Sequence, residues 1–316
     1  MAAGDFHWAS LGGLHRSHSL YRFSSKNKRK GRQNMQELKA HRFADDFVFL
    51  EAPRWYDGCL WVPDVFDSIL YQVDVSGRRV VLKDNLPPRP NSLGFLSDGT
   101  PLIVSSVARQ ILKLVDGELL VHADLSKWAT GDLNDFAVAD NGCLYVGNFG
   151  YDLFMGEEKR ETSLHIVELD GTVSHGSDGV EFPNGAVILN HGRTLVVAET
   201  WRGRLTAFDR ALDGSLSNRR LFADIAGREP DGMCADAEGG VWVCSFNTGE
   251  VLRVLEGGEI THRLHFPGSA VACELGGDDG HTLFITTYDG TIPDQQARKR
   301  LGALNQVQVD IPRAGS

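Results

Sequence analysis

From about residue 50 onward, short apolar runs that directly follow a glycine-containing turn recur along the chain. The six runs with their turns are DG-CLWV from Asp57, DGTP-LIV from Asp98, NG-CLYV from Asn141, HGR-TLVV from His191, EGG-VWV from Glu238 and DGH-TLFI from Asp279. Their turn glycines are separated by 41, 43, 50, 47 and 41 residues. Asn-Gly and Asp-Gly supply the positive φ angles of tight hairpins, so the pattern predicts six β-hairpins.

Each predicted hairpin belongs to a larger unit with a constant plan. An apolar strand precedes the turn, a strand of alternating polar and apolar residues follows the hairpin, and a more polar segment suits a fourth, outer strand. Four antiparallel strands in about 40–50 residues are typical of one β-propeller blade. We therefore expect an all-β, six-bladed propeller over residues 35–316, with four antiparallel strands per blade.

Closure of the ring is also predicted. The segment AHRFAD from Ala40 is expected to complete the last blade as an N-terminal strand, leaving no exposed sheet edge. Helices are expected only as short turns at DLSKWA and DQQARKRLG. Two sandwich domains would be the alternative, but they require a linker near the middle, where the repeat instead continues through NDFAVADNGC and PDGMCADAEGG.

Polar residues recur where the innermost strand of each unit begins. They are Glu51, Asn91, Asn134, Asn184, Asp231 and Ser269 or Ala270. Carboxylates and amides converging on one axis form a cage of hard oxygen donors, which favours Ca²⁺ over Mg²⁺ or Mn²⁺, and Zn²⁺ would have to accept an all-oxygen site. The alternative is that these residues cap strands or turns, as Asn and Asp commonly do.

Several fragments resemble one known family. FLEAPRW, LNDFAV, FPNGAV, EPDGMCADAEGGVWV and AVACELGG, in this order, are similar to motifs of the regucalcin and gluconolactonase family of six-bladed propellers. The resemblance implies that Glu51, Asn184 and Asp231 bind one divalent metal ion, usually Ca²⁺, and that Asn134 contacts substrate. It also implies a hydrolase that opens lactone or related ester rings.

The resemblance has one clear departure. Family members that act on sugar lactones have an arginine two residues before the motif asparagine, where this chain has Asp132. A sugar-acid lactone is therefore not assured as the substrate. In a loose alignment of the following loop, Asp152 takes the role of a substrate-contacting acid.

A mechanism follows from these residue types. A bound cation polarises the carbonyl, and Asp231 acts as general base toward water or as a nucleophile. Aromatic residues in the blade loops are candidates for the pocket wall, namely Trp55, Phe149, Tyr151, Trp201 and Phe246. Two other classes stay open: a non-catalytic calcium- or ligand-binding propeller and an interaction propeller. Within the hydrolase class, organophosphate hydrolysis, as in diisopropylfluorophosphatase-like propellers, is an alternative to lactone hydrolysis.

Composition narrows the partners. The 316 residues carry a net charge of −10, which argues against a general nucleic-acid binder. The sequence contains no run of about 18 apolar residues, so a membrane-spanning helix is not expected. A small-molecule lactone or ester is the expected partner, and the sequence carries no signal for a particular oligomeric state. Five cysteines without a CxxC pair favour a reducing, cytoplasmic setting, although Cys234 and Cys244 could meet across a hairpin.

The first 34 residues differ from the rest. They hold seven Lys or Arg and one acid, a net charge of +6, so the remainder carries −16. The run KNKRKGR resembles a nuclear-localisation or anion-binding patch, and LGGLHRSHSLYRFSS loosely resembles an organelle transit peptide. We expect residues 1–34 to be a basic, disordered extension, with organelle targeting as the open alternative.

Overall fold

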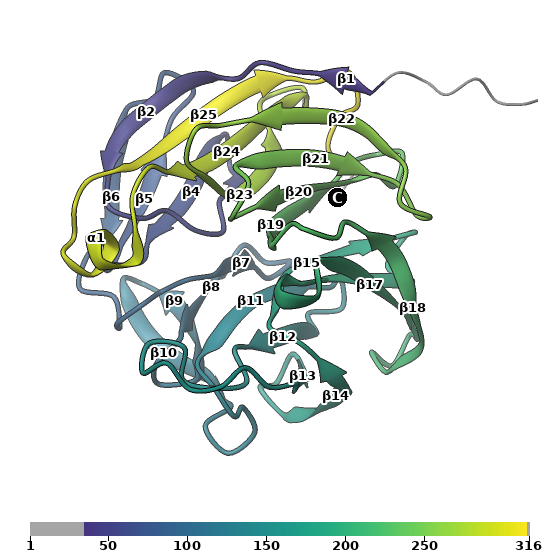
Figure 1. The fold of residues 1–316 in the computed structure, drawn as a ribbon. Coiled ribbons are helices and arrows are strands. Elements are labelled where there is room, and N and C mark those ends of the chain that lie inside the picture. The colour runs from purple at the N-terminus through teal and green to yellow at the C-terminus, as the bar shows by residue number, and fades with distance from the viewer. Residues whose placement is uncertain (1–34, 315–316) are drawn as a thin grey trace, which may run out of the picture. The chain divides into compact units, whose positions relative to one another are not determined.

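The computed structural model describes residues 35–314, and the predicted basic extension lies outside them. Six antiparallel sheets are arranged around one axis as the blades of a propeller (Figure 1). The six-bladed fold expected from the repeat is therefore confirmed. No helix of this described part is long and apolar enough to cross a bilayer.

Each blade runs in chain order from its innermost strand outward, except that the N-terminal strands β2 (His41–Phe47) and β1 (Gln36–Glu37) are added at the outer edges of blades 6 and 5. Blades 1 to 3 contain β3 (Arg54–Tyr56), β4 (Cys59–Asp64), β5 (Ile69–Val73) and β6 (Arg79–Lys83), then β7 (Leu93–Phe95), β8 (Pro101–Ser105), β9 (Gln110–Val115) and β10 (Glu118–Asp124), then β11 (Leu133–Val138), β12 (Leu144–Asn148), β13 (Thr162–Val167) and β14 (Val173–Val180).

Blades 4 to 6 follow the same order. They contain β15 (Pro183–Leu189), β16 (Thr194–Glu199), β17 (Arg204–Arg210) and β18 (Leu216–Asp224), then β19 (Pro230–Ala235), β20 (Val241–Ser245), β21 (Glu250–Val254) and β22 (Ile260–His265), then β23 (Ser269–Gly276), β24 (Thr282–Tyr288), β25 (Gly302–Gln308) and β2 (His41–Phe47).

The N-terminal strand closes the ring as expected. Strand β2 pairs antiparallel with β25, so blade 6 is built from both ends of the described chain (Figure 1). Phe47, at the end of β2, is fully buried. The sequence did not predict β1 (Gln36–Glu37), which adds a parallel fifth strand to blade 5 beside β22.

Helical structure is confined to two short segments of the described residues. The helix α1 (Ile292–Gln296), which overlaps only the start of the predicted DQQARKRLG segment, begins with a capping box between Thr291 and Asp294. The segment DLSKWA forms turns, and an unpredicted 3₁₀-helix, η1 (Thr200–Arg202), follows β16.

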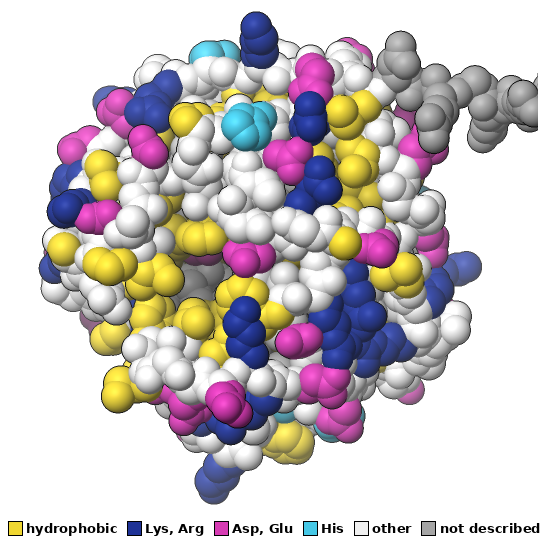
Figure 2. All heavy atoms as spheres, viewed as in Figure 1, with side chains coloured by type: hydrophobic (Ala, Val, Ile, Leu, Met, Phe, Trp, Pro, Cys, Tyr) yellow, Lys and Arg dark blue, Asp and Glu magenta, His cyan; other side chains and the backbone are white. Residues whose placement is uncertain are grey.

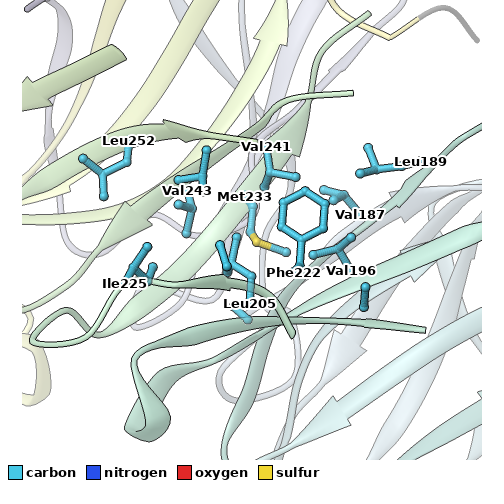
Figure 3. Packing of buried hydrophobic residues seen from close by; sticks show 14 residues of the cluster. Val187, Leu189, Val196, Leu205, Phe222, Ile225, Met233, Val241, Val243 and Leu252 are labelled. Atoms are coloured by element: carbon cyan, nitrogen blue, oxygen red, sulfur yellow. The ribbon is translucent and has the colours of Figure 1, made fainter. Parts of the chain in front are cut away.

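The hydrophobic core lies between neighbouring blades. The largest cluster joins blades 4 and 5, where Met233 and Phe222 lie among aliphatic side chains of both sheets (Figure 3). All five cysteines are free thiols, and the Sγ of Cys234 lies 3.8 Å from that of Cys273 in blade 6, in a cluster that also contains Cys244. Since Cys234, Cys244 and Cys273 fill space between blades 5 and 6, they act as small apolar groups.

Candidate metal and substrate site

The predicted polar residues lie at one end of the central channel, where the innermost strands begin. Asn134, Asn184 and Asp231 are each the second residue of their strand, in β11, β15 and β19. All three strands have a break in register directly at this residue, between Leu133 and Phe136, between Pro183 and Ala186, and between Pro230 and Met233. A β-bulge re-aims a side chain, so a shared bulge gives the three residues equivalent positions in the ring.

Glu51 reaches this end of the channel from a loop. It precedes β3, and its backbone N–H donates to the carbonyl of Pro63, 3.1 Å away. The carboxylate of Asp64 fixes the same loop by accepting from the N–H groups of Val48 and Phe49, at 2.8 and 3.0 Å. The side chain of Glu51 accepts only the neighbouring N–H of Ala52 among the described residues, which leaves its remaining acceptor capacity free.

Glu51, which is half-buried, and Asp231, which is buried, are acids whose charges repel. Burial is the main cause that raises the pKa of Glu51 well above its usual value, and the charges of Asp231 and Asp135 raise it further. Burial also raises the pKa of Asp231 well above normal, with Asp135 and Glu229 adding to it and a hydrogen bond from Asn184 opposing it. A cation between such carboxylates would relieve both the repulsion and the cost of burial.

The amide side chains complete an oxygen-rich set. Asn134 Nδ2 donates to the carbonyl of Pro183 (3.0 Å), and Asn184 Nδ2 donates to the hydroxyl of Thr200 (3.3 Å). Asn91 Nδ2 donates to the carbonyl of Leu133, whereas its buried Oδ1 finds no hydrogen-bond partner among the described residues. A buried acceptor without a donor costs free energy, so an ion or a bound ligand atom fits this position.

These donors fit a hard cation. Two carboxylates and several amide oxygens match the ligands of Ca²⁺. Histidine and cysteine do not contribute, and the described residues contain no cluster of three or more His, Cys, Asp or Glu that could hold a metal ion. A metal at this site would therefore depend on the amide oxygens as much as on Glu51 and Asp231.

Directly beside the candidate ligands lies an ion pair that the sequence reasoning missed. Asp135 is buried and accepts from Arg54 of blade 1 at 3.3 Å, from the backbone of Phe136 at 2.8 Å, and from the hydroxyl of Ser92. Burial raises the pKa of Asp135 although Arg54 and Ser92 oppose the shift. The only sequence signal for Asp135 was that an aspartate follows Asn134 in the ND motif. The other repeat units have no aspartate at this position.

The other end of the channel holds a cavity of about 830 Å³. It is lined by the distal halves of the inner strands and their turns, including Trp55, Phe95, Glu274 and Arg313, and by none of the candidate ligands. Trp55 stacks on Phe284 of blade 6 with ring centroids 5.4 Å apart. The expectation that Trp55 belongs to the wall of the metal pocket is therefore wrong, because β3 begins only at Arg54 and carries Trp55 toward the opposite end.

Asp132, where the sequence departs from the family pattern, is paired with an arginine that precedes the neighbouring blade. Asp132 forms an ion pair of 2.5 Å with Arg89, whose guanidinium carbon lies 4.0 Å from the centre of the Phe154 ring. Arg89 has a φ of 58°, an uncommon conformation for a residue other than glycine. Asp152 is exposed and caps its own loop by accepting from the N–H groups of Phe154 and Met155, and its charge contributes to raising the pKa of Asp132, behind burial.

The fold is a six-bladed β-propeller whose central channel is lined at one end by carboxylate and amide oxygens. The family model described as the SMP-30/gluconolactonase/LRE-like region matches residues 49–289. The chain belongs to this family.

Relatives and solved structures agree with this assignment. Regucalcin of Bos taurus is 31% identical over 252 residues, covering 75% of this chain and 82% of the relative, and regucalcin of Danio rerio is 27% identical over 235 residues, covering 70% and 79%. A structure described as a calcium-binding protein, regucalcin, from Agrobacterium tumefaciens strain C58 superposes with a TM-score of 0.73 at 22% identity, covering 89% and 97% of the two chains. A gluconolactonase from Xanthomonas campestris gives 0.70 at 23%, covering 85% and 89%. The structural likeness supports the fold.

Proposed function

We propose that this protein is a divalent-cation-dependent hydrolase that opens lactones or related carboxylic esters, with Ca²⁺ as the preferred ion. The observation that carries the proposal is the pair of mutually repelling carboxylates, half-buried Glu51 and buried Asp231, set among amide oxygens at the channel end. The regucalcin and gluconolactonase relatives support a lactonase or calcium-binding role for this chain.

Each residue has a role in the proposed reaction. Glu51, Asn184 and Asp231 hold the cation, which when bound polarises the carbonyl of the substrate. Asn134 orients a substrate oxygen, and the hydrogen bond from its amide nitrogen to the carbonyl of Pro183 supports this role by fixing the side chain. Asp231 accepts a proton from water as the water oxygen adds to the carbonyl carbon, and returns it to the ring oxygen as the C–O bond breaks. One lactone and one water thus give one hydroxy acid.

The surroundings suit Asp231 as the base. A carboxylate beside a cation is a weak base, and burial together with Asp135 opposes that loss by raising its pKa. Asp152, exposed at the rim, stays a proposed substrate contact, with one oxygen already used in its own loop.

A panel of lactones, esters and phosphoesters, assayed by acid release with and without a chelator, tests the proposal. We expect turnover of a lactone or ester that chelation removes and Ca²⁺ restores. Asp231→Ala should abolish turnover while the protein stays folded, and Asp213→Ala, in the exposed turn after β17, should keep it. Unchanged turnover of Asp231→Ala with the cation bound would refute the mechanism. Calcium binding without turnover on any member of the panel would favour the non-catalytic calcium-binding role.

A further inference from the structure

Two aromatic clusters flank the candidate cation site. The Phe182 cluster consists of Phe149, Tyr151 and Phe182 with the half-buried Leu153, Phe154 and Trp201. The Phe49 cluster consists of Val48, Phe49, Val65, Val271 and Tyr288 with the half-buried Phe66 and Phe246. Figure 2 shows hydrophobic side chains gathered around a hollow near the middle of the face it views, the face on which α1 lies in Figure 1.

The Phe182 cluster is attached to the segments that present the two asparagines. Phe182 precedes Asn184 by two residues, and Phe149 donates its N–H to the carbonyl of Asp132, at 2.9 Å. The Phe149 and Phe182 rings stack with centroids 4.6 Å apart, and the Trp201 ring lies 4.8 Å from that of Phe182. Trp201 also donates its indole N–H to the Tyr151 hydroxyl at 2.8 Å, so its one polar hydrogen is used within the cluster.

The Phe49 cluster is attached in the same way to the two acids. Phe49 precedes Glu51 by two residues, and Phe246 donates its backbone N–H to the carbonyl of Glu229, two residues before Asp231. The Phe49 ring lies 5.2 Å from Tyr288, 6.0 Å from Phe66 and 6.5 Å from Phe246, measured between centroids. Apolar ring surface thus lies next to both pairs of candidate ligands.

Each charged group beside these clusters contacts either an opposite charge or a ring face. Arg89 is bound to Asp132 and lies over Phe154, and the ammonium group of Lys159 lies 3.4 Å from the centre of the Trp201 ring. Asp67, next to Phe66, is paired with Arg298 and Arg300. A ligand rich in hydroxyl groups would therefore lose water against ring faces that offer it no hydrogen bonds.

From this arrangement we infer that the non-reacting part of the substrate is apolar, an aryl or alkyl substituent that packs on the half-buried rings of Phe154, Trp201, Phe66 and Phe246. The inference rests on the proposed hydrolysis of a lactone or ester and names its substrate class. Packing a flat apolar group on these rings removes apolar surface of both the substrate and the protein from water. The reacting carbonyl meanwhile stays at the oxygen-rich end of the channel.

Turnover of matched lactones tests the inference. The substrates are δ-valerolactone, δ-valerolactone with a phenyl group on the ring, and glucono-δ-lactone, with kcat/KM measured in Ca²⁺. We expect the phenyl compound to exceed each of the other two at least tenfold. Phe246→Ala and Phe154→Ala should lower the ratio of phenyl to unsubstituted lactone about tenfold, mainly through KM. Phe95→Ala, a half-buried aromatic at the opposite cavity, is the matched control and should leave the ratio unchanged.

Binding provides a second readout that does not require turnover. The phenyl-substituted δ-valerolactam, an amide analogue, should bind at least tenfold tighter than δ-valerolactam by calorimetry, and Phe246→Ala should remove the difference. Faster turnover of glucono-δ-lactone with a phenyl ratio insensitive to both variants would overturn the inference and leave the proposed hydrolysis intact. Absence of turnover on all lactones, with phenyl-dependent lactam binding retained, would instead contradict the hydrolysis and keep the apolar site.

Discussion

At the scale of single residues, the site places negative charge where burial disfavours it. Glu51 and Asp231 repel each other, and Asp135 adds to the repulsion of both. Among the described residues, Arg54 is the only basic side chain that contacts one of these three acids, and it contacts Asp135. A bound cation would compensate the remaining negative charge. The acids that would bind the cation should therefore lower the stability of the cation-free protein.

The variant Asp231→Asn tests this opposition. Without a cation it should be more stable than the wild type by about 1–2 kcal/mol, because one buried charge is removed at nearly constant shape. Its affinity for Ca²⁺ should fall by about tenfold or more. Thermal unfolding in chelator and in Ca²⁺ measures both effects. A variant that is less stable in chelator and still strongly stabilised by Ca²⁺ would show that Asp231 is no ligand.

A buried histidine predicts acid sensitivity. His165 in β13 is 3% exposed, neither ring nitrogen has a partner among the described residues, and burial, with a contribution from His175, lowers its pKa to about 4. Because the unfolded chain binds this proton near pH 6.5, the folded state is favoured fully above that pH and loses the advantage as pH falls toward 4. The loss between pH 7 and 4 should be on the order of 3 kcal/mol.

Urea unfolding at several pH values measures this loss. His165→Leu should flatten the acid limb of the stability profile, whereas His191→Leu, at an exposed turn, should leave it unchanged. An identical acid limb in wild type and His165→Leu would contradict the assignment.

The residues of the site were partly accessible from sequence. The repeat located Glu51, Asn134, Asn184 and Asp231 because each stands at the same point of its unit, and the structure places all of them at the same channel end. Asp135 and the Arg89–Asp132 pair were not predictable, since both join blades through contacts between residues 81 and 43 positions apart. Such pairings depend on how blades meet, which the pattern of a single blade does not contain.

At the scale of elements, the bulges in β11, β15 and β19 determine where Asn134, Asn184 and Asp231 lie. The glycine after Asn184 contributes to this, since a Cβ on Gly185 would lie 2.5 Å from the carbonyl oxygen of Asp231 and 2.7 Å from Met233 Cγ. Strands β15 and β19 can approach this closely only without a side chain at that position. Hydrophobic alternation predicted the strands well, but it carried no information about the bulges.

We expect Gly185→Ala to separate β15 from β19. The variant should lose about 1–3 kcal/mol of stability from overpacking and about tenfold or more in Ca²⁺ affinity, because Asn184 and Asp231 move apart. Gly94→Ala in β7 is the matched control, since its Cβ would meet the side chains of Phe136 and Val138 at 2.7 and 2.8 Å rather than backbone. It should cost stability without a comparable loss of Ca²⁺ affinity. Equal affinity losses in both variants would exclude a specific effect at the site.

At the scale of the whole molecule, closure of the ring depends on β2. Removing residues 1–47 deletes β1 and β2, exposes the edge of β25 and strips Phe47 from its buried cluster. This truncation should lower stability by about 3–5 kcal/mol from the loss of Phe47 alone. A chain that starts at Met35 is the control and should unfold like the full chain, because residues 1–34 are predicted to be an extension. Denaturant unfolding compares the three. Equal stability of the 48–316 chain would show that ring closure by β2 is dispensable.

The side-by-side placement of β2 and β25 also bears on how the chain could be cut and rejoined. Because the two ends of the folded ring meet in neighbouring strands of one blade, a short linker from the end of β25 to the start of β2 would permit new termini in a turn of any other blade. Such circular permutants would keep every inner strand in place while changing which blade is synthesised last. They would reveal whether the channel is assembled progressively or only when the final blade docks.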